Sequence, residues 1–229
     1  MANRTLSSSP LRLLRRTTGR DHASRMPSLL DEPSLFYDPP YDNPVDDAFA
    51  WHLVKYLRRG SGLRYQVAGP LWDDYNLAID FVVEYKARRV GFMCGASPEG
   101  AAHDRRGDAL RIGRGGVDVL YRLRADDIEQ HLHDALLLVA RWDAGLFSDR
   151  GRINLNTLAT PEARTVQPRW NETIVTVHYA GKDKGGGSAA LQLQRLSQSH
   201  PDGWVPAYEQ VCQDAGIAPS TAQPWARSA

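Results

Sequence analysis

Three short segments rich in β-branched and aromatic residues constrain the fold more than any other feature; they cover residues 64–68, 77–83 and 89–93. Each has the length and composition of a β-strand. A short polar turn, residues 84–87, separates the second segment from the third, so these two are expected to form a hairpin. A fourth segment of this kind covers residues 117–123. The sequence therefore predicts a sheet that begins as a three-stranded meander.

Helical signals surround these strands. Asn43 is a good N-cap and Pro44 suits the first helical position, which predicts a helix that ends near Arg59. A short helix is predicted over residues 104–112, before a Gly-rich stretch. A long helix is predicted over residues 126–143, capped by its first aspartate and apolar along one face. This order of helices and strands is typical of an α/β protein.

The first part of the chain differs from the rest in composition. Residues 1–40 are rich in Ser, Arg and Pro and lack apolar periodicity, so we expect a disordered basic tail without a targeting role. Six arginines and one aspartate give residues 1–26 a charge of +5, whereas residues 40–150 carry −2. The domain predicted over residues 41–150 therefore lacks the positive balance that phosphate contacts favour.

Residues 151–229 are expected to form a small C-terminal α+β extension. Strand-like segments at 173–179 and 191–196 flank a Gly-rich stretch that can turn a hairpin. Residues 206–215 favour a helix. The sequence leaves open whether this hairpin-plus-helix extension is a second domain or completes the first.

Cysteine usage and hydropathy indicate the cellular setting. Cys94 and Cys212 have no Cys or His at metal-ligand spacing, which predicts two buried thiols in a reducing, cytoplasmic environment. The longest apolar run, residues 135–140, is far shorter than the roughly 20 residues of a transmembrane helix. We therefore expect no membrane contact, while the oligomeric state is not predicted.

The order of the segments resembles a known family. The residues that carry the resemblance are Asn43-Pro44-Val45-Asp46, residues 77–83, residues 89–95, His103, Arg105-Arg106-Gly107-Asp108-Ala109-Leu110, Gly116 and Val119-Leu120-Tyr121-Arg122. In this order they are similar to small restriction-endonuclease-like proteins of the PD-(D/E)xK superfamily, related to the very-short-patch repair endonucleases. The match covers about residues 43–143, under half of the chain. It implies a mixed four-stranded sheet flanked by helices, with a Mg²⁺ site on neighbouring strands.

The resemblance also implies where that site would lie. In the family, a helix acid, an aspartate on the second strand and an acid pair on the third strand hold a hard cation for phosphodiester hydrolysis. Asp46 matches the helix acid, and Asp80 matches the strand aspartate that would bind the metal. The third-strand pair falls on Phe92, which cannot ligate, and on Cys94, a soft ligand. The implied site is degenerate, so we expect no cofactor, or Mg²⁺ if the protein is active.

Other acids could replace the missing pair. Residues 84–86 spell the Glu-x-Lys signature of the superfamily, but so soon after Asp80 they are expected to form an exposed turn. The acids on the loop and short helix that pass the site in the family are better placed; they are Glu99, Asp104 and Asp108. Asp108 also lies one helical turn from Arg111, so a surface ion pair is an equal alternative.

The remaining candidates are histidines and tryptophans. His103 matches a loop histidine that lies near the scissile phosphate in relatives. His131 and His133 are two residues apart on a helix and point to different faces, so they are not expected to share a metal. The tryptophans, Trp170 among them, are explained by packing. The candidate catalytic residues, all vestigial or weak, are Asp80, Asp46, His103 and Asp108.

Three functional hypotheses follow. The first is a catalytically degenerate nuclease fold, a pseudoenzyme that serves as a DNA-binding or structural module. The second is an active Mg²⁺-dependent DNA endonuclease whose acidic ligands have migrated to Asp46, Asp80 and one of Glu99 or Asp108. The third is a protein-interaction module that binds a protein partner and no nucleic acid. The first is favoured, because the segments around Asp80 follow the order seen in the family while Phe92 and Cys94 replace the third-strand acids.

Overall fold

The structure is a computed structural model. It describes residues 39–67, 78–95, 105–112, 116–180 and 190–197. The predicted tail, apart from its last two residues, and the predicted helix at 206–215 lie outside the described residues. So do the candidate residues Glu99, His103 and Asp104.

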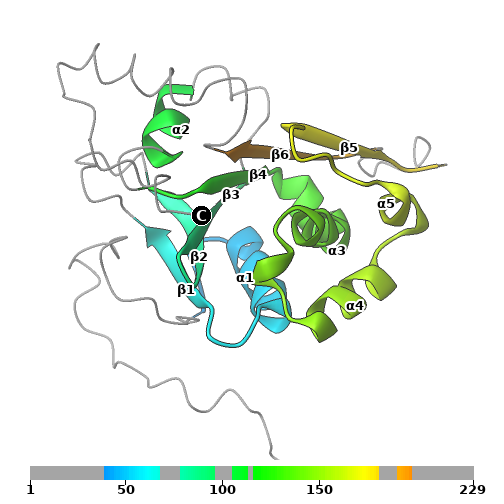
Figure 1. Cartoon of the computed structure of the whole chain (residues 1–229), viewed down its shortest axis with the longest axis horizontal. Coiled ribbons are helices and arrows are strands. Elements are labelled where there is room, and N and C mark those ends of the chain that lie inside the picture. The colour runs from blue at the N-terminus through cyan, green and yellow to red at the C-terminus, as the bar shows by residue number, and fades with distance from the viewer. Residues whose placement is uncertain (1–38, 68–77, 96–104, 113–115, 181–189, 198–229) are drawn as a thin grey trace, which may run out of the picture.

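A six-stranded mixed sheet forms the centre of the fold, in the order β1-β2-β3-β4-β6-β5 (Figure 1). The strands are β1 (Gly62–Val67), β2 (Ile79–Tyr85), β3 (Arg88–Cys94), β4 (Val119–Leu123), β5 (Ile174–His178) and β6 (Ala190–Ser197). The β3–β4 pair is parallel, and the other neighbouring pairs are antiparallel. The predicted meander of β1, β2 and β3 and the mixed α/β class are thus confirmed.

The sheet has six strands where the resemblance implied a core of four. The two additional strands come from the C-terminal part of the chain: β5 and β6 pair antiparallel, and β6 also pairs with β4. Leu120 of β4 lies opposite Leu196 of β6. Residues predicted as an extension therefore continue the same sheet.

Within the described residues, six helical segments accompany the sheet. They are α1 (Pro44–Tyr56), α2 (Arg105–Ile112), α3 (Ala125–Trp142), the 3-10 turn η3 (Ala144–Leu146), α4 (Asp149–Leu158) and α5 (Pro161–Thr165). The predicted start of α1 is confirmed, since the side chain of Asn43 accepts a hydrogen bond from the backbone amide of Asp46 at 2.9 Å. Of the described helices, none combines the length and the apolar character that crossing a membrane requires.

The start of α3 differs from the prediction. The N-cap residue is Arg124, which makes no capping hydrogen bond through its side chain, and the predicted cap Asp126 lies within the first turn. There its carboxylate is near the positive end of the helix dipole. The neighbouring Asp127 instead accepts two hydrogen bonds from the Arg124 guanidinium, at 2.7 and 2.8 Å. An ion pair thus takes the place of the cap at this helix end.

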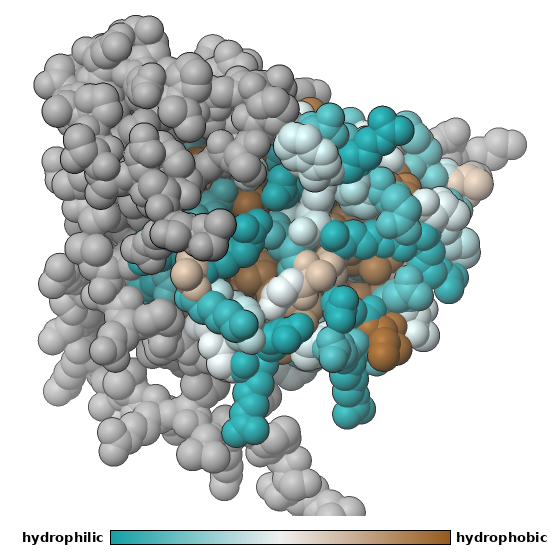
Figure 2. All heavy atoms as spheres, viewed as in Figure 1, coloured by the Kyte–Doolittle hydropathy of each residue, from teal (hydrophilic) through white to brown (hydrophobic). Residues whose placement is uncertain are grey.

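The helices α4 and α5 were not predicted from the sequence, although both carry cap signals. Ser148 accepts a hydrogen bond from the amide of Gly151, and Thr160, followed by a proline, accepts one from Ala163. The apolar periodicity that usually reveals a helix is weak in α4, because this helix buries little of itself. It exposes Ile153 and Leu158, and Figure 2 shows a hydrophobic patch over α4.

Helices cover both faces of the sheet (Figure 1). The larger core lies between the sheet and α1 and α3, and is centred on aromatic residues such as Phe49, Phe81 and Phe92. A smaller core on the opposite face contains Ile112 of α2. Asp80 of β2 lies between Ile79 of the smaller core and Phe81 of the larger core.

An apolar row runs across the α2 face of the sheet. Val82, Gly91, Leu120 and Leu196 lie opposite one another on β2, β3, β4 and β6. Gly91 is packed so closely that a Cβ atom at this position would lie 2.9 Å from Leu120 Cδ1 and 3.1 Å from Ile79 Cγ2. The close packing of this row therefore depends on the absence of a side chain at Gly91.

We expect Gly91→Ala to lower the free energy of unfolding by about 1–3 kcal/mol, the usual cost of overpacking a close-packed core. The urea midpoint at pH 7.5 measures the change. Gly145→Ala is the matched control, because a Cβ atom there would meet nothing within 4 Å. A Gly91→Ala variant as stable as the wild-type protein would show that the row relaxes without cost.

Candidate functional site

Asp80 occupies the centre of the candidate site. It is the second residue of β2, and its Oδ2 accepts a hydrogen bond of 2.7 Å from the backbone amide of Cys94 at the end of β3. Burial raises the pKa of Asp80 to about 6, and the charge of Asp46 contributes in the same direction. The Cys94 amide and the charges of Arg111 and Arg122 oppose this rise in pKa. Asp80 therefore lies among both acidic and basic groups.

Asp46, the helix acid, is buried near the start of α1. Its Oδ2 accepts hydrogen bonds from Asn43 Nδ2 at 2.9 Å and from the Tyr65 hydroxyl at 3.0 Å. Its Oδ1 is also buried but has no hydrogen-bond partner in the part of the chain that the structure describes. Burial raises the pKa of Asp46, while the Tyr65 and Asn43 hydrogen bonds oppose the rise. The structure thus places the charge of Asp46 where it acts on the ionisation of Asp80.

The two positions of the missing acid pair have different environments. Phe92 is fully buried in the larger core and stacks on Tyr121, with ring centres 5.5 Å apart. Cys94 is half-buried beside Asp80. Burial, followed by the charges of Asp80 and Asp46, raises the pKa of the Cys94 thiol. The thiolate is the reactive form of cysteine, so a thiol that stays protonated is a poor nucleophile.

Asp108 is held by arginines. Its carboxylate accepts hydrogen bonds of 3.2 Å from Arg111 Nη1 and from Arg122 Nε, and a further bond from Arg122 Nη2. The predicted ion pair with Arg111 is present, but it is buried instead of lying on the surface. The position of Arg122 explains the difference, because this β4 residue lies opposite Met93 in the sheet and approaches Asp108 on α2. The carboxylate of Asp108 therefore attaches α2 to the sheet.

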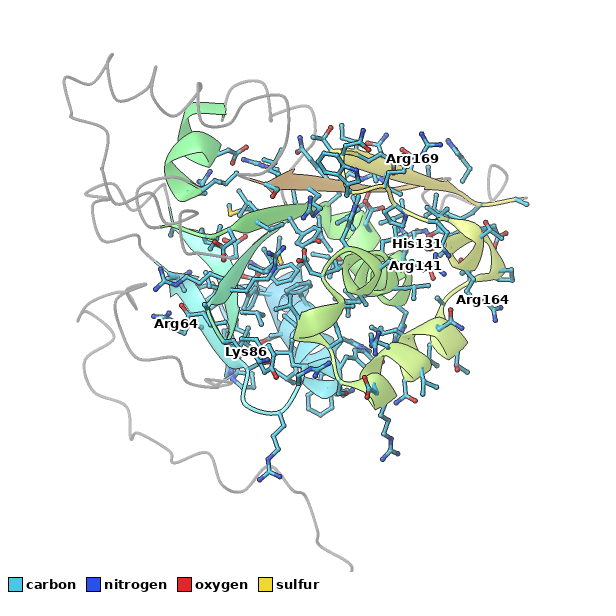
Figure 3. All side chains as sticks on the ribbon, in the orientation of Figure 1. Arg64, Lys86, His131, Arg141, Arg164 and Arg169 are labelled. Atoms are coloured by element: carbon cyan, nitrogen blue, oxygen red, sulfur yellow. The ribbon has the colours of Figure 1, made fainter. Side chains whose placement is uncertain are left out.

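Glu84 is buried, so the prediction of an exposed turn at this residue is wrong. The strand β2 continues to Tyr85, and Lys86, with a φ of 56°, forms the exposed turn (Figure 3). Glu84 Oε1 lies 2.5 Å from Arg64 Nη2 and 3.0 Å from Arg89 Nε. These ion pairs join the first three strands on the α2 face. The Glu-x-Lys pattern therefore marks a structural ion pair in this protein.

The described residues do not reproduce the acid set that the family uses for Mg²⁺. Among the residues of the described ranges, no group of three or more His, Cys, Asp or Glu side chains is arranged to hold a metal ion. Asp80 has Asp46 as its acidic neighbour, and positive charge reaches it from Arg111 and Arg122. Guanidinium groups therefore stabilise the negative charge of Asp80 in this structure.

Sequence reasoning missed two residues that shape this environment, Arg122 and Tyr65. Arg122 interrupts an otherwise apolar strand of five residues, all of them buried. An arginine in such a strand requires a buried partner, so this signal was present in the sequence. Tyr65 donates to Asp46 across 19 residues of chain, which no local pattern predicts.

The two histidines of α3 contact residues other than Asp80. His131 (Figure 3) stacks on Tyr179 with ring centres 4.1 Å apart, whereas His133 contacts Tyr56 of α1, so the prediction that they point to different faces is confirmed. Trp170 is 69% exposed, so packing does not explain this residue. Neither finding adds a metal ligand near Asp80.

Known proteins offer no match to this chain. No family model, curated protein or solved structure matches it. The function is therefore inferred from the geometry of the described residues and from the resemblance noted in the sequence.

We expect Asp80→Asn to stabilise the fold at neutral pH. The pKa of about 6 lies above the ordinary 3.8, so the folded protein keeps this proton where the unfolded chain has lost it, and stability falls as the pH rises from about 4 to about 6 and stays lower above that. A shift of this size corresponds to about 2–3 kcal/mol. Asparagine preserves an acceptor for the Cys94 amide without the charge.

Urea unfolding of both proteins at a series of pH values measures this effect. The advantage of the Asp80→Asn variant should be absent near pH 4 and grow as the pH rises to 7. A variant that is less stable than the wild-type protein at pH 7 would show that the Asp80 carboxylate stabilises the fold through its arginine neighbours.

Asp108→Asn is expected to lower the free energy of unfolding by about 3–5 kcal/mol, because it leaves two buried guanidinium groups without their carboxylate. Thermal or urea unfolding measures the loss. Asp149→Asn provides the control, since Asp149 forms an exposed ion pair with Arg152 at the same i, i+3 spacing and its loss should leave the midpoint nearly unchanged. Equal effects of the two substitutions would contradict a structural role for Asp108.

Proposed function

We propose that this protein is a catalytically degenerate nuclease-fold protein that acts as a nucleic-acid-binding or structural module. One observation carries the proposal: the Asp80 carboxylate faces a backbone amide and arginine charges where the resembling family has further carboxylates. Phosphodiester hydrolysis by this family needs a cation that activates water and neutralises charge on the phosphate. Arginine can neutralise charge, but it cannot generate a metal-bound hydroxide.

The neighbouring side chains support the same conclusion. A divalent cation bound to Asp80 would have the thiol of Cys94 as a neighbour, and the Asp108 carboxylate is already engaged by two arginines. The cation would also meet repulsion from Arg111 and Arg122. These features favour loss of cleavage with retention of the fold.

DNA is the proposed nucleic-acid partner because of the resemblance and the arginines of residues 1–26. Basic segments bind phosphates without reading sequence, and the affinity they provide decreases steeply with salt. Residues 40–150, with their slightly negative balance, would then contribute orientation and not most of the affinity.

One observation supports an active Mg²⁺-dependent endonuclease as the second candidate. Asp46 Oδ1 is buried without a hydrogen-bond partner among the described residues, and the charge of Asp46 acts on Asp80. Magnesium often binds to proteins through one or two carboxylates and completes its shell with water and substrate phosphate. Asp46 and Asp80 could meet that minimal requirement.

A nicking assay separates the two candidates. The full-length protein is incubated with supercoiled plasmid and either Mg²⁺ or Mn²⁺, beside Asp80→Asn and Asp149→Asn variants purified in the same way. The pseudoenzyme proposal predicts equal background nicking for all three proteins. Cleavage by the wild-type protein and the Asp149→Asn variant, lost in the Asp80→Asn variant, would overturn it in favour of the active enzyme.

Binding is tested on the full-length chain at 50 and 200 mM salt with a labelled DNA duplex. The wild-type protein is compared with a variant in which the six arginines of residues 1–26 are changed to glutamine. We expect the variant to lose at least about tenfold in affinity and most of the salt dependence. Absence of DNA binding by the wild-type protein would instead favour a protein-interaction module.

A further inference from the structure

Two imidazole rings meet between α1 and α3, outside the acidic site. His52 of α1 and His133 of α3 have ring centres 4.9 Å apart, with their planes at 87°. Tyr56 lies one helical turn after His52 on α1, and its hydroxyl is 3.1 Å from His133 Nε2. Three side chains that carry a nitrogen or oxygen atom able to bind a metal ion thus meet between two helices that pack together.

His52 also has an unused ligand atom. Its Nδ1 is shielded from solvent and has no hydrogen-bond partner among the described residues. A shielded polar atom without a partner costs free energy, and buried polar groups in folded proteins nearly always have one. An ion bound to this nitrogen would remove that cost.

We propose that His52 and His133, assisted by the Tyr56 hydroxyl, bind a borderline divalent transition-metal ion of the Zn²⁺, Ni²⁺ and Cu²⁺ class. Imidazole nitrogen is a preferred ligand of these ions. Two imidazoles that share one ion at about 2.0–2.1 Å per bond have ring centres roughly 5 Å apart at a tetrahedral angle. The observed separation fits this requirement, and rotation about the soft terminal torsion of each ring can direct a nitrogen towards the ion.

The charges around the pair are consistent with metal binding near neutral pH. Burial lowers the pKa of both histidines, so their rings are neutral and can ligate at pH 7.5. Lys55 disfavours additional positive charge at both rings, while Asp134 favours it at His133. Lys55 lies over the ring of Trp51, with its Nζ 4.0 Å from the ring centre. Lys55 therefore limits the affinity of the site without being a ligand.

His52 and His133 are each only partly buried, so the pair lies near the protein surface. The donor set also distinguishes this proposal from the Mg²⁺ question at Asp80. Hard cations such as Mg²⁺ prefer carboxylate oxygens, and borderline ions prefer imidazole. The two proposals therefore fail or succeed independently.

Titration calorimetry on the full-length, untagged protein at pH 7.5 tests the site with Zn²⁺, Ni²⁺ and Cu²⁺. We expect one equivalent of each ion to bind, with Cu²⁺ the tightest. His52→Ala and His133→Ala should each weaken binding at least about tenfold, because each substitution removes one of the two imidazole ligands. Tyr56→Phe should weaken it less, and Lys55→Gln should strengthen it.

His178→Ala is the matched control, because His178 is exposed on the edge strand β5 and should leave the affinity unchanged. If an alanine variant fails to fold, paramagnetic broadening in the wild-type protein decides: the ring protons of His52 and His133 should broaden before all others when Ni²⁺ or Cu²⁺ is added. Wild-type affinity in the folded His52→Ala and His133→Ala variants, or first broadening at other histidines, would overturn the proposal.

Discussion

The buried ion pairs of Asp108 with Arg111 and Arg122 determine much of the structure around the candidate site. They attach α2 to β4 through groups that are almost fully buried, where removing one partner leaves a charge without compensation. They also place two guanidinium groups close enough to Asp80 to act on its ionisation. Helix attachment and the electrostatics of Asp80 are therefore coupled, and a change to one alters the other.

The sequence predicted those helices and strands that are marked by residues close together in the chain. The cap at Asn43, the strand-like segments and the long apolar stripe of α3 each depend on residues close in the chain, and the structure contains the corresponding helix and strands. The weakly apolar α4, which packs on α1 and α3, escaped this reasoning because few of its residues are apolar. Its cap residue Ser148 was the local signal that remained.

The site was less predictable than the fold for a physical reason. The buried state of Glu84 depends on Arg64 and Arg89, and that of Asp108 depends on Arg122, all contributed by neighbouring strands. Whether a carboxylate is a free ligand or half of an ion pair is decided by such long-range contacts. The positions of Asp46 and Asp80 came from the resemblance, and the structure places their charges within reach of each other.

Asp80 illustrates how a group that destabilises the folded state can indicate function. A carboxyl whose pKa is raised to about 6 by burial favours the unfolded state at neutral pH, and strand positions normally avoid such groups. Active and binding sites are the usual exceptions, since a ligand with positive charge can recover the lost free energy. In this protein the arginines recover part of it internally. The part that the arginines do not recover makes the ionisation of Asp80 a cost to folding at neutral pH, which a ligand of positive charge would reduce.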